Sequence, residues 1–374
     1  MRFIHLSDLH IGKRINGFSM IEDQKYILDR ISGIIKDQNA DAVIIAGDVY
    51  DKGVPPVEGV ALFDSFLSSL SELAIPVFIT SGNHDSAERL AFGSKLFKNS
   101  RIYISPAFDG RLNPIELADD IRIYLLPFIK PAHVRAVFKN DETESYSDAV
   151  KLVLDNTELD KTKCNILVAH QLVTGAVRSD SEEISVGGID NVDASVFDGF
   201  DYVALGHIHK KQKISRDNLR YCGSPLKYSF SEAKHEKSVT VVDAVCKSIT
   251  VSEIPLVPLR DMREIKGTYA DLTLKSNYEN TNTEDYLHVT LTDEDEIPYA
   301  IEKLRTIYPN IMRLDYENSH TAVQNTVDSA ENIKEKSPAE LFEELYFLQN
   351  NQNLSDGQKE FFNKIMSEIE EEQI

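Results

Sequence analysis

The sequence predicts an α/β fold, followed by a small α+β module and a C-terminal helical hairpin. Three observations support this prediction. Five short apolar runs, rich in β-branched residues, each end in polar side chains, as strands buried on both faces of a sheet do. Pro255 and Pro258 then mark a boundary before a segment with mixed strand and helix patterns. Two amphipathic helical patterns with start signals occupy the C-terminal end.

The five apolar runs are the expected strands of the first domain. They lie at residues 3–6, 42–46, 76–79, 166–168 and 202–205 and lead into the segments DLH, GDVYD, GNHD, AH and GHIH. Ligand sites in open sheets gather where the carboxyl ends of the strands meet. We therefore expect polar residues from separate segments to converge on one cleft.

These segments supply oxygen and imidazole donors and no thiolate. The candidate metal ligands are Asp8, His10, Asp48, Asn83, His170, His207 and His209. This donor set suits Mn, Fe or Zn better than Mg alone. Seven residues exceed what one four- to six-coordinate ion needs, but they suit two ions that share a bridging carboxylate. Two ions about 3.5–4 Å apart can hold an attacking hydroxide and the phosphate oxygens of an in-line displacement, which predicts phosphoester hydrolysis.

The spacing within the segments also favours convergence. In an extended chain the outer residues of D-x-H and H-x-H point the same way, so we expect Asp8 and His10 to face the cleft together, and His207 and His209 likewise. A glycine precedes a ligand in three segments, where it permits a tight turn and close backbone approach. These glycines are Gly47, Gly82 and Gly206.

His84 follows the candidate ligand Asn83 and lies where a side chain can face the substrate. We predict that it stabilises the transition state or protonates the leaving oxygen. The carboxylate of Asp51, which closes GDVYD, is expected to orient that imidazole through its other ring nitrogen. His84 and Asp51 are therefore the candidate catalytic residues.

Taken in order, the motifs D-x-H, G-D-x-x-D, G-N-H-D, H and G-H-x-H resemble the calcineurin-like metallophosphoesterase superfamily over roughly residues 1–255. The segments FIHLSDLHIG, AGDVYDKG, TSGNHDS, GHIHKKQ and YCGSPLKYSFSE are similar to the SbcD family, the bacterial counterpart of the Mre nuclease. The resemblance implies a β-sandwich flanked by helices. The superfamily's serine/threonine phosphatases carry arginine and glutamate where this chain has Lys52 and Asp85, which weakens a protein-phosphatase interpretation.

The resemblance also implies roles for the donors. One metal would be held by Asp8, His10 and His209, the other by Asn83, His170 and His207, with Asp48 bridging them and His84 catalytic. The family's preferred metal is manganese. The implied activity is that of a DNA nuclease using a dimetal-bridged hydroxide: a double-strand 3′–5′ exonuclease and single-strand or hairpin endonuclease in repair, recombination and replication.

The charge of the whole chain and the charge near the expected metal ligands point to different ways of binding DNA. A formal net charge of −21 argues against a protein that coats DNA by charge alone. Between residues 207 and 237, however, eight Lys/Arg face three Asp/Glu, and this stretch begins at the HIH ligands. A local basic rim suits a phosphate-backbone substrate. We predict that Lys210 and Lys211 contact DNA phosphates; the alternative is that they are solvated surface charges.

The hydrophobic and polar patterns divide the chain into four expected parts. Residues 1–255 form the expected nuclease domain, and residues 256–317 a capping, DNA-specificity module. Strands are expected near 263–274, 286–292 and 311–316, with a helix over 298–308. Polar residues 318–336 are typical of a linker. Residues 337–374 are the expected helical hairpin, with capping-box signals at Ser337 and Ser355.

Two short amphipathic helices need a surface to cover their apolar faces. They dock either on their own core or on a partner, and the resemblance implies the coiled-coil base of an SbcC-type ATPase. The chain has no G-x-x-x-x-G-K-[ST] loop, so another chain must bind the ATP. The resemblance further implies a homodimer within a heterotetramer that acts on DNA ends and hairpins. A helix face over residues 62–70 suits either sheet packing or self-association, and we favour sheet packing.

Composition limits the remaining classes. No apolar run approaches the roughly 18 residues of a membrane span, and the N-terminus enters a strand without a signal-peptide pattern. Three scattered cysteines indicate neither a zinc site nor a disulfide framework, which favours the cytoplasm.

Two other functions compete with the nuclease: a small-molecule phosphodiesterase or phosphatase of the same superfamily, and a non-catalytic scaffold. The basic rim argues against the first, and the intact donor set against the second.

Overall fold

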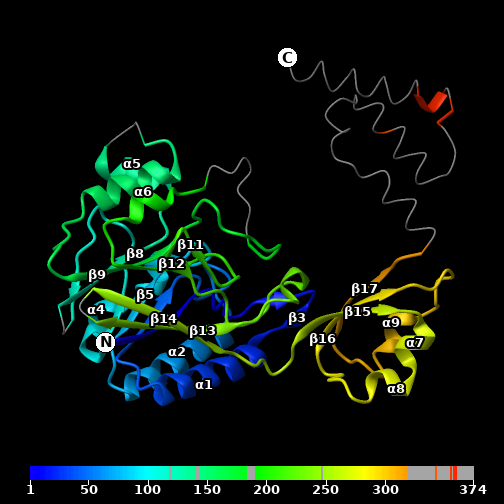
Figure 1. The fold of residues 1–374 in the computed structure, drawn as a ribbon. Helices are drawn as coiled ribbons and strands as arrows, with labels where there is room; N and C mark the ends of the chain where they lie inside the picture. The colour runs from blue at the N-terminus through cyan, green and yellow to red at the C-terminus, as the bar shows by residue number, and fades with distance from the viewer. Residues whose placement is uncertain are drawn as a thin grey trace. The chain divides into compact units, whose positions relative to one another are not determined.

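The computed structural model describes residues 1–117, 120–139, 143–182, 190–245 and 247–318, together with residues 342, 354–355 and 357–359. Two six-stranded sheets lie face to face, and helices cover their outer faces (Figure 1). Contacts divide the chain into a larger unit, which holds both sheets, and a smaller unit formed by residues 267–269, 291–298 and 316–374.

The first sheet holds three of the predicted strands. Its order is β14-β13-β1-β4-β5-β6, and β1, β4, β5 and β6 run parallel. Their bounds are β1 (Arg2–Leu6), β4 (Ala42–Ala46), β5 (Val77–Thr80), β6 (Ile102–Ile104), β13 (Ser238–Val245) and β14 (Ser248–Pro255). Every residue of β4 and β5 is buried, as expected for continuous apolar runs. The ends of β1, β4 and β5 therefore lie along one edge of the sheet.

The second sheet holds the other two predicted strands. Its order is β11-β12-β10-β9-β8-β7, and β8, β9, β10 and β12 run parallel. Their bounds are β7 (Ile115–Glu116), β8 (Ile121–Leu126), β9 (Cys164–His170), β10 (Tyr202–Gly206), β11 (Gln212–Ile214) and β12 (Arg216–Tyr221). The register pairs Gly206 with His170, so β9 and β10 end at the same level.

The core forms three layers of apolar side chains. Between the sheets, Phe3 and Ile44 of the first sheet share a buried cluster with Ile166 and Ala204 of the second. The helices α1 (Ile21–Asp37) and α2 (Val57–Glu72) pack on the outer face of the first sheet, and α5 (Pro131–Phe138) and α6 (Tyr146–Asp155) pack on that of the second. This arrangement confirms the predicted α/β class and the β-sandwich flanked by helices.

The apolar face of α2 confirms the sheet-packing interpretation. Phe63, Phe66 and Leu70 are buried in the cluster under α1 and α2, and Leu62 and Leu67 pack against it partly buried. A different face of the helix remains open, because Val57 and Val60 are 84% and 46% exposed. Short helices follow β5, namely α3 (Ala87–Leu90) and α4 (Ser94–Phe97), and a hairpin of β2 (Arg14–Ile15) and β3 (Phe18–Ser19) precedes α1.

The segment after β14 contains a three-stranded sheet in the order β15-β16-β17. Its elements are β15 (Met262–Gly267), α7 (Tyr269–Thr273), α8 (Lys275–Tyr278), β16 (Tyr286–Leu291), α9 (Ala300–Leu304) and β17 (Ile311–Tyr316). The predicted strand at 311–316 and the one near 286–292 are confirmed. The strand expected over 263–274 is wrong beyond Gly267: its neighbour β16 offers only six residues for pairing, and residues 269–273 turn into a helix.

Polar contacts fix this segment within the larger unit. Arg260 donates to Glu22 at 2.6 Å and to Asp23 at 2.9 Å, both in the first turn of α1. The Tyr286 hydroxyl donates to the buried Asp23 carboxylate at 2.6 Å. A buried carboxylate is stable where donors surround it, so these contacts hold Arg260 and Tyr286 against the first turn of α1, all within the larger unit.

The predicted linker and the first predicted C-terminal helix fall almost wholly outside the described residues. At the second predicted start, the main-chain N–H of Ser355 donates to Gln358 Oε1 at 2.9 Å, which is one half of a capping box. Among the residues that the structure describes, no helix combines the length and the apolar composition needed to cross a lipid bilayer.

Candidate metal centre

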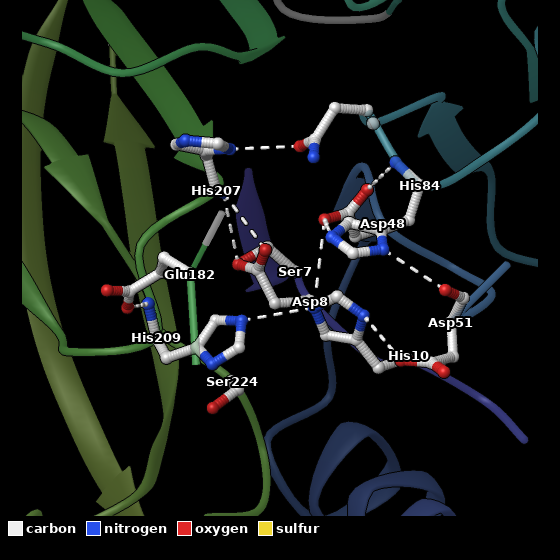
Figure 2. A network of polar contacts seen from close by, with 12 residues as sticks. Ser7, Asp8, His10, Asp48, Asp51, His84, Glu182, His207, His209 and Ser224 are labelled. Carbon is white, nitrogen blue, oxygen red and sulfur yellow. Dashed lines mark hydrogen bonds and ion pairs between the residues drawn. The ribbon is translucent and has the colours of Figure 1, made fainter. Parts of the chain in front are cut away.

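The predicted ligands come together at the carboxyl ends of five strands. Asp8 and His10 follow β1, Asp48 follows β4, and Asn83 follows β5. His170 is the last residue of β9, and His207 and His209 follow β10. Because each sheet is parallel here and the two sheets face each other, seven donors from five segments share one site. Figure 2 labels Asp8, His10, Asp48, His207 and His209 among them.

One group of donors consists of Asp8, His10 and His209. Their ligand atoms all lie within 4.8 Å of one another, and all three residues are buried. His10 Nε2 and His209 Nε2 are 3.0 Å apart, so two ring nitrogens point at the same space. Ring nitrogens arranged in this way, beside a carboxylate, suit a shared cation.

A second group lies around Asn83. Its Oδ1 is 3.0 Å from His170 Nε2 and 3.0 Å from His207 Nδ1. The Asp48 carboxylate lies between the groups, since its Oδ2 is 3.2 Å from His170 Nε2 and 3.7 Å from His10 Nε2. This is the placement that a carboxylate bridging two ions requires.

The electrostatics of the site suit metal ligation. Burial lowers the pKa of His207 to about 3 and that of His10 well below its usual value, so both rings are neutral near pH 7 and have a free lone pair. Burial opposes ionisation of Asp48, yet His170, followed by His10 and His84, holds its pKa well below the usual range. The exception is His170: despite its burial, the Asp48 carboxylate raises its pKa to about 9, so a divalent cation would have to displace the proton on this ring in order to bind it.

The backbone at the ligands is left-handed, so the extended chain expected from strand alternation is wrong, although Asp8 and His10 do face one site as predicted. Asp8, His10 and His207 have φ angles of 53°, 44° and 105°, so neither D-x-H nor H-x-H is an extended chain. Residues other than glycine adopt such angles at a cost of order 1–3 kcal/mol each, and they keep them only where the surroundings impose them. Here they do: the His207 N–H donates to Asp8 Oδ1 at 3.0 Å, and the His10 N–H donates to the Asp48 carbonyl at 2.9 Å.

His84 and Asp51 meet, but through a different atom than predicted. His84 Nδ1 contacts the main-chain carbonyl of Asp51 at 3.1 Å (Figure 2). The Asp51 carboxylate instead pairs with Lys13 at 2.6 Å and lies 3.6 Å from His10 Nδ1. The imidazole of His84 is held by the carbonyl because the turn after β4 presents it, while the nearby ammonium attracts the carboxylate.

Sequence reasoning missed several buried groups that support the site. Asp85 accepts main-chain N–H bonds from Val49, Tyr50 and Gly82 at 2.9–3.1 Å, and so ties two ligand segments together. Its place at the end of GNHD was a usable signal. The side chains around His209 come from remote segments: Ser181, Glu182, Glu232 and Lys237. Of these, Glu232 lies in a segment that the sequence had singled out, at the end of YCGSPLKYSFSE.

The predicted DNA-contacting lysines differ in surroundings. Lys210 is exposed directly after His209, whereas Lys211 forms an ion pair with Glu253 at 2.9 Å. A paired lysine offers less free charge to a phosphate than an unpaired one. Lys210 is therefore the better placed of the two to contact an anion.

Comparisons with known proteins find similarity along nearly the whole chain. Residues 1–211 match the model of the calcineurin-like phosphoesterase family, and residues 258–350 match that of the Type 5 capsule protein repressor C-terminal domain. A curated protein of Staphylococcus epidermidis, named as the SbcD subunit of the nuclease SbcCD, is 35% identical over 380 residues, which cover 99% of each chain.

Solved structures give more distant similarities. A dimetal phosphatase from Danio rerio is 11% identical with a TM-score of 0.42, covering 69% of this chain and 96% of its own. A structure from Thermus thermophilus is 11% identical with a TM-score of 0.38, covering 67% and 98%.

Proposed function

The chain belongs to the SbcD family of calcineurin-like phosphoesterases, and on that premise we propose that it is the nuclease subunit of an SbcCD-type complex. The enzyme is a hydrolase that depends on divalent metal. Its proposed substrates are DNA ends and hairpins, cut by double-strand 3′–5′ exonuclease and single-strand endonuclease action. The observation that supports this most is the 35% identity to a nuclease subunit across 99% of both chains.

The seven donors would hold two ions in the roles given by their grouping. Asp8, His10 and His209 would hold one, Asn83, His170 and His207 the other, and Asp48 would bridge them. We propose Mn²⁺, which suits mixed imidazole and oxygen donors. When bound, two such ions supply the charge that activates water and neutralises phosphate oxygens during an in-line displacement.

The residues of this chain position and protonate the substrate. His84 is only partly buried, with 17% of its side chain exposed, so a substrate can reach its ring. With Nδ1–H donating to the Asp51 carbonyl, Nε2 is the ring nitrogen that faces the substrate, and it can give a proton to the leaving oxygen only from the doubly protonated ring. The Asp48 carboxylate lies 4.0 Å from Nε2, close enough to stabilise the positive charge that the ring carries before this transfer.

The test is a cleavage assay of the purified chain with Mn²⁺ on a labelled DNA hairpin, a linear duplex and a p-nitrophenyl phosphodiester, beside Asp48→Asn. We expect DNA cleavage by the wild type and none by the variant, because an amide at this position removes the bridging charge. Cleavage of the small ester alone, with and without the partner ATPase, would replace the nuclease with the small-molecule phosphodiesterase.

The basic segment after His209 is proposed to bind the DNA backbone. Replacing Lys210 and Lys211 with alanine is expected to weaken DNA binding. The logarithm of the binding constant should also fall less steeply with the logarithm of salt concentration, by about 1–2 in slope, since each phosphate contact contributes about 0.9. Fluorescence anisotropy at several salt concentrations measures both. Lys25→Ala/Lys36→Ala, on α1, is the matched control, and an unchanged slope for the first pair would refute the contact.

Assembly with an SbcC-type ATPase is proposed to use the C-terminal helices, and self-association to use the open face near α2. Exposed apolar side chains gather there and just after α3: Val54, Val57, Val60, Phe92 and Leu96. The Arg89 guanidinium donates to the Gly53 carbonyl at 2.7 Å and so links the two segments. Large exposed apolar patches mark interaction sites.

Truncation after residue 335 should therefore separate the two interactions. We expect the shortened chain to keep the mass of a dimer in light scattering and to cleave small phosphodiesters with Mn²⁺, but to lose copurification with the ATPase. Retention of a tight ATPase complex would place the interface elsewhere. We propose the cytoplasm as the compartment, where the buried thiols of Cys164 and Cys222 stay reduced.

A further inference from the structure

A group of buried and partly buried polar side chains lies behind the metal ligand His209. Glu232, at the end of a short 3-10 turn (Phe230–Glu232), is fully buried. Its Oε1 accepts the Ser181 hydroxyl at 2.5 Å and lies 3.2 Å from His209 Nδ1. The same hydroxyl oxygen is 2.8 Å from Nδ1. Two groups from distant segments therefore meet at the ring nitrogen that faces away from the metal site.

These contacts fix the tautomer of His209. A carboxylate without a proton can only accept, and the Ser181 hydroxyl already gives its hydrogen to Glu232. His209 Nδ1 must therefore be the donor, which leaves the lone pair on Nε2. That atom is the one that points at His10 Nε2, 3.0 Å away. The ring is thus oriented and protonated as a metal ligand should be.

Lys237 completes the arrangement. It is almost wholly buried, and its ammonium group donates to Glu232 Oε2, to the Ser224 hydroxyl at 2.8 Å and to the main-chain carbonyl of His209 at 2.9 Å. All three of its donors are used. Lys237 therefore neutralises the buried carboxylate and also fixes the backbone of the ligand.

The other donor group has no comparable support among the described residues. His170 Nδ1 donates to the main-chain carbonyl of Ala46 at 2.8 Å, a neutral acceptor. A charged acceptor makes an imidazole a stronger ligand than a neutral one does. The two halves of the metal centre therefore differ in the charge behind their histidines.

We propose that Glu232, through Ser181 and held by Lys237, is the positioning residue that sets the metal affinity of the site formed by Asp8, His10 and His209. The inference rests on the proposed metal centre and deepens it. It assigns to the segment over residues 224–237 a role in loading one of the two ions. Removal of the Glu232 charge should weaken that ion's binding 10–100-fold and leave the other ion's affinity nearly unchanged.

The test measures metal binding rather than turnover. Free Mn²⁺ gives a six-line electron paramagnetic resonance signal that bound Mn²⁺ loses, so titration of the metal-free full chain reports both affinities. The variants are Glu232→Gln, Ser181→Ala and the double variant Glu232→Gln/Lys237→Met, with melting temperatures measured for each. Glu253→Gln is the matched control, because it also removes an ion-paired carboxylate, from Lys211 and Arg220.

We expect Glu232→Gln to lower both the affinity of one Mn²⁺ and the melting temperature, since Lys237 is left buried without its counter-ion. The double variant removes both charges, so it should regain melting temperature but not affinity. Ser181→Ala should weaken the same Mn²⁺ and leave the ion pair intact. If the double variant regained Mn²⁺ affinity together with melting temperature, the role of Glu232 would be merely structural and the proposal would be overturned. Wild-type Mn²⁺ affinity in both Ser181→Ala and the double variant would overturn it as well. A wild-type chain that binds no Mn²⁺ would instead overturn the proposed function.

Discussion

Replacing His84 with alanine is expected to lower kcat for DNA cleavage by about 10²–10⁴-fold, the usual contribution of a general acid or base. The effect should fall on kcat rather than on metal binding, because the ring lies beside the donor groups: its Nδ1 contacts the Asp51 carbonyl and its Nε2 is 4.0 Å from Asp48. The alanine variant keeps the main-chain N–H that donates to Asp48 Oδ1 at 3.0 Å, so the bridging carboxylate should stay in place.

Single-turnover cleavage of a labelled hairpin, with Mn²⁺ binding measured in parallel, checks this result. His133→Ala is the matched control, since His133 is an exposed histidine on α5 and should leave the rate unchanged. A small loss in the His84 variant, below about tenfold, would mean that the ring does not transfer the proton. A loss of Mn²⁺ binding equal to the loss of rate would instead make His84 a metal ligand.

Replacing Gly206 with alanine is expected to lower the free energy of unfolding by about 3 kcal/mol or more and to disrupt metal binding. A Cβ on Gly206 would lie 1.8 Å from the Ala46 carbonyl oxygen and 2.7 Å from His170 Nδ1. Both neighbours belong to the site, because that carbonyl accepts the hydrogen bond from His170 at 2.8 Å. The added methyl group must push apart the ends of β4 and β10, which belong to facing sheets.

Urea unfolding gives the change in stability, and the Mn²⁺ titration gives the change in affinity. Gly33→Ala is the matched control: it lies within α1, and apart from its chain neighbours and the backbone of that helix no atom lies within 4 Å of its added Cβ. A helical alanine there should raise the free energy of unfolding by about 0.5–1 kcal/mol. If Gly206→Ala changed stability by less than about 0.5 kcal/mol, the close approach of the two sheets would be wrong.

The sequence predicted the parts of the fold that depend on local patterns. Continuous apolar runs determine which segments can be buried strands, and β4 and β10 begin where their runs begin. The polar residues that end those runs identified the site, because parallel strands of one sheet end at a common edge. The apolar face of α2 and the last strand, at 311–316, were likewise predictable from periodicity.

The tertiary structure decided which atoms meet. The left-handed backbone at Asp8 and His207 depends on the hydrogen bond between these two residues, which follow β1 and β10 of different sheets. The contact of His84 with a carbonyl rather than a carboxylate depends on Lys13, far from both in sequence. Strand pairing likewise ended β15 at Gly267.

What the sequence by itself determined was the inventory: buried strands, the donors at their ends and the metal chemistry that these donors allow. Only the tertiary structure decided the support behind them, such as Glu232 and Lys237 at His209. The physical reason is that hydrophobic periodicity records which face of a segment is buried. A buried hydrogen bond depends on partners that only the folded chain brings within about 3 Å, and no local pattern records them.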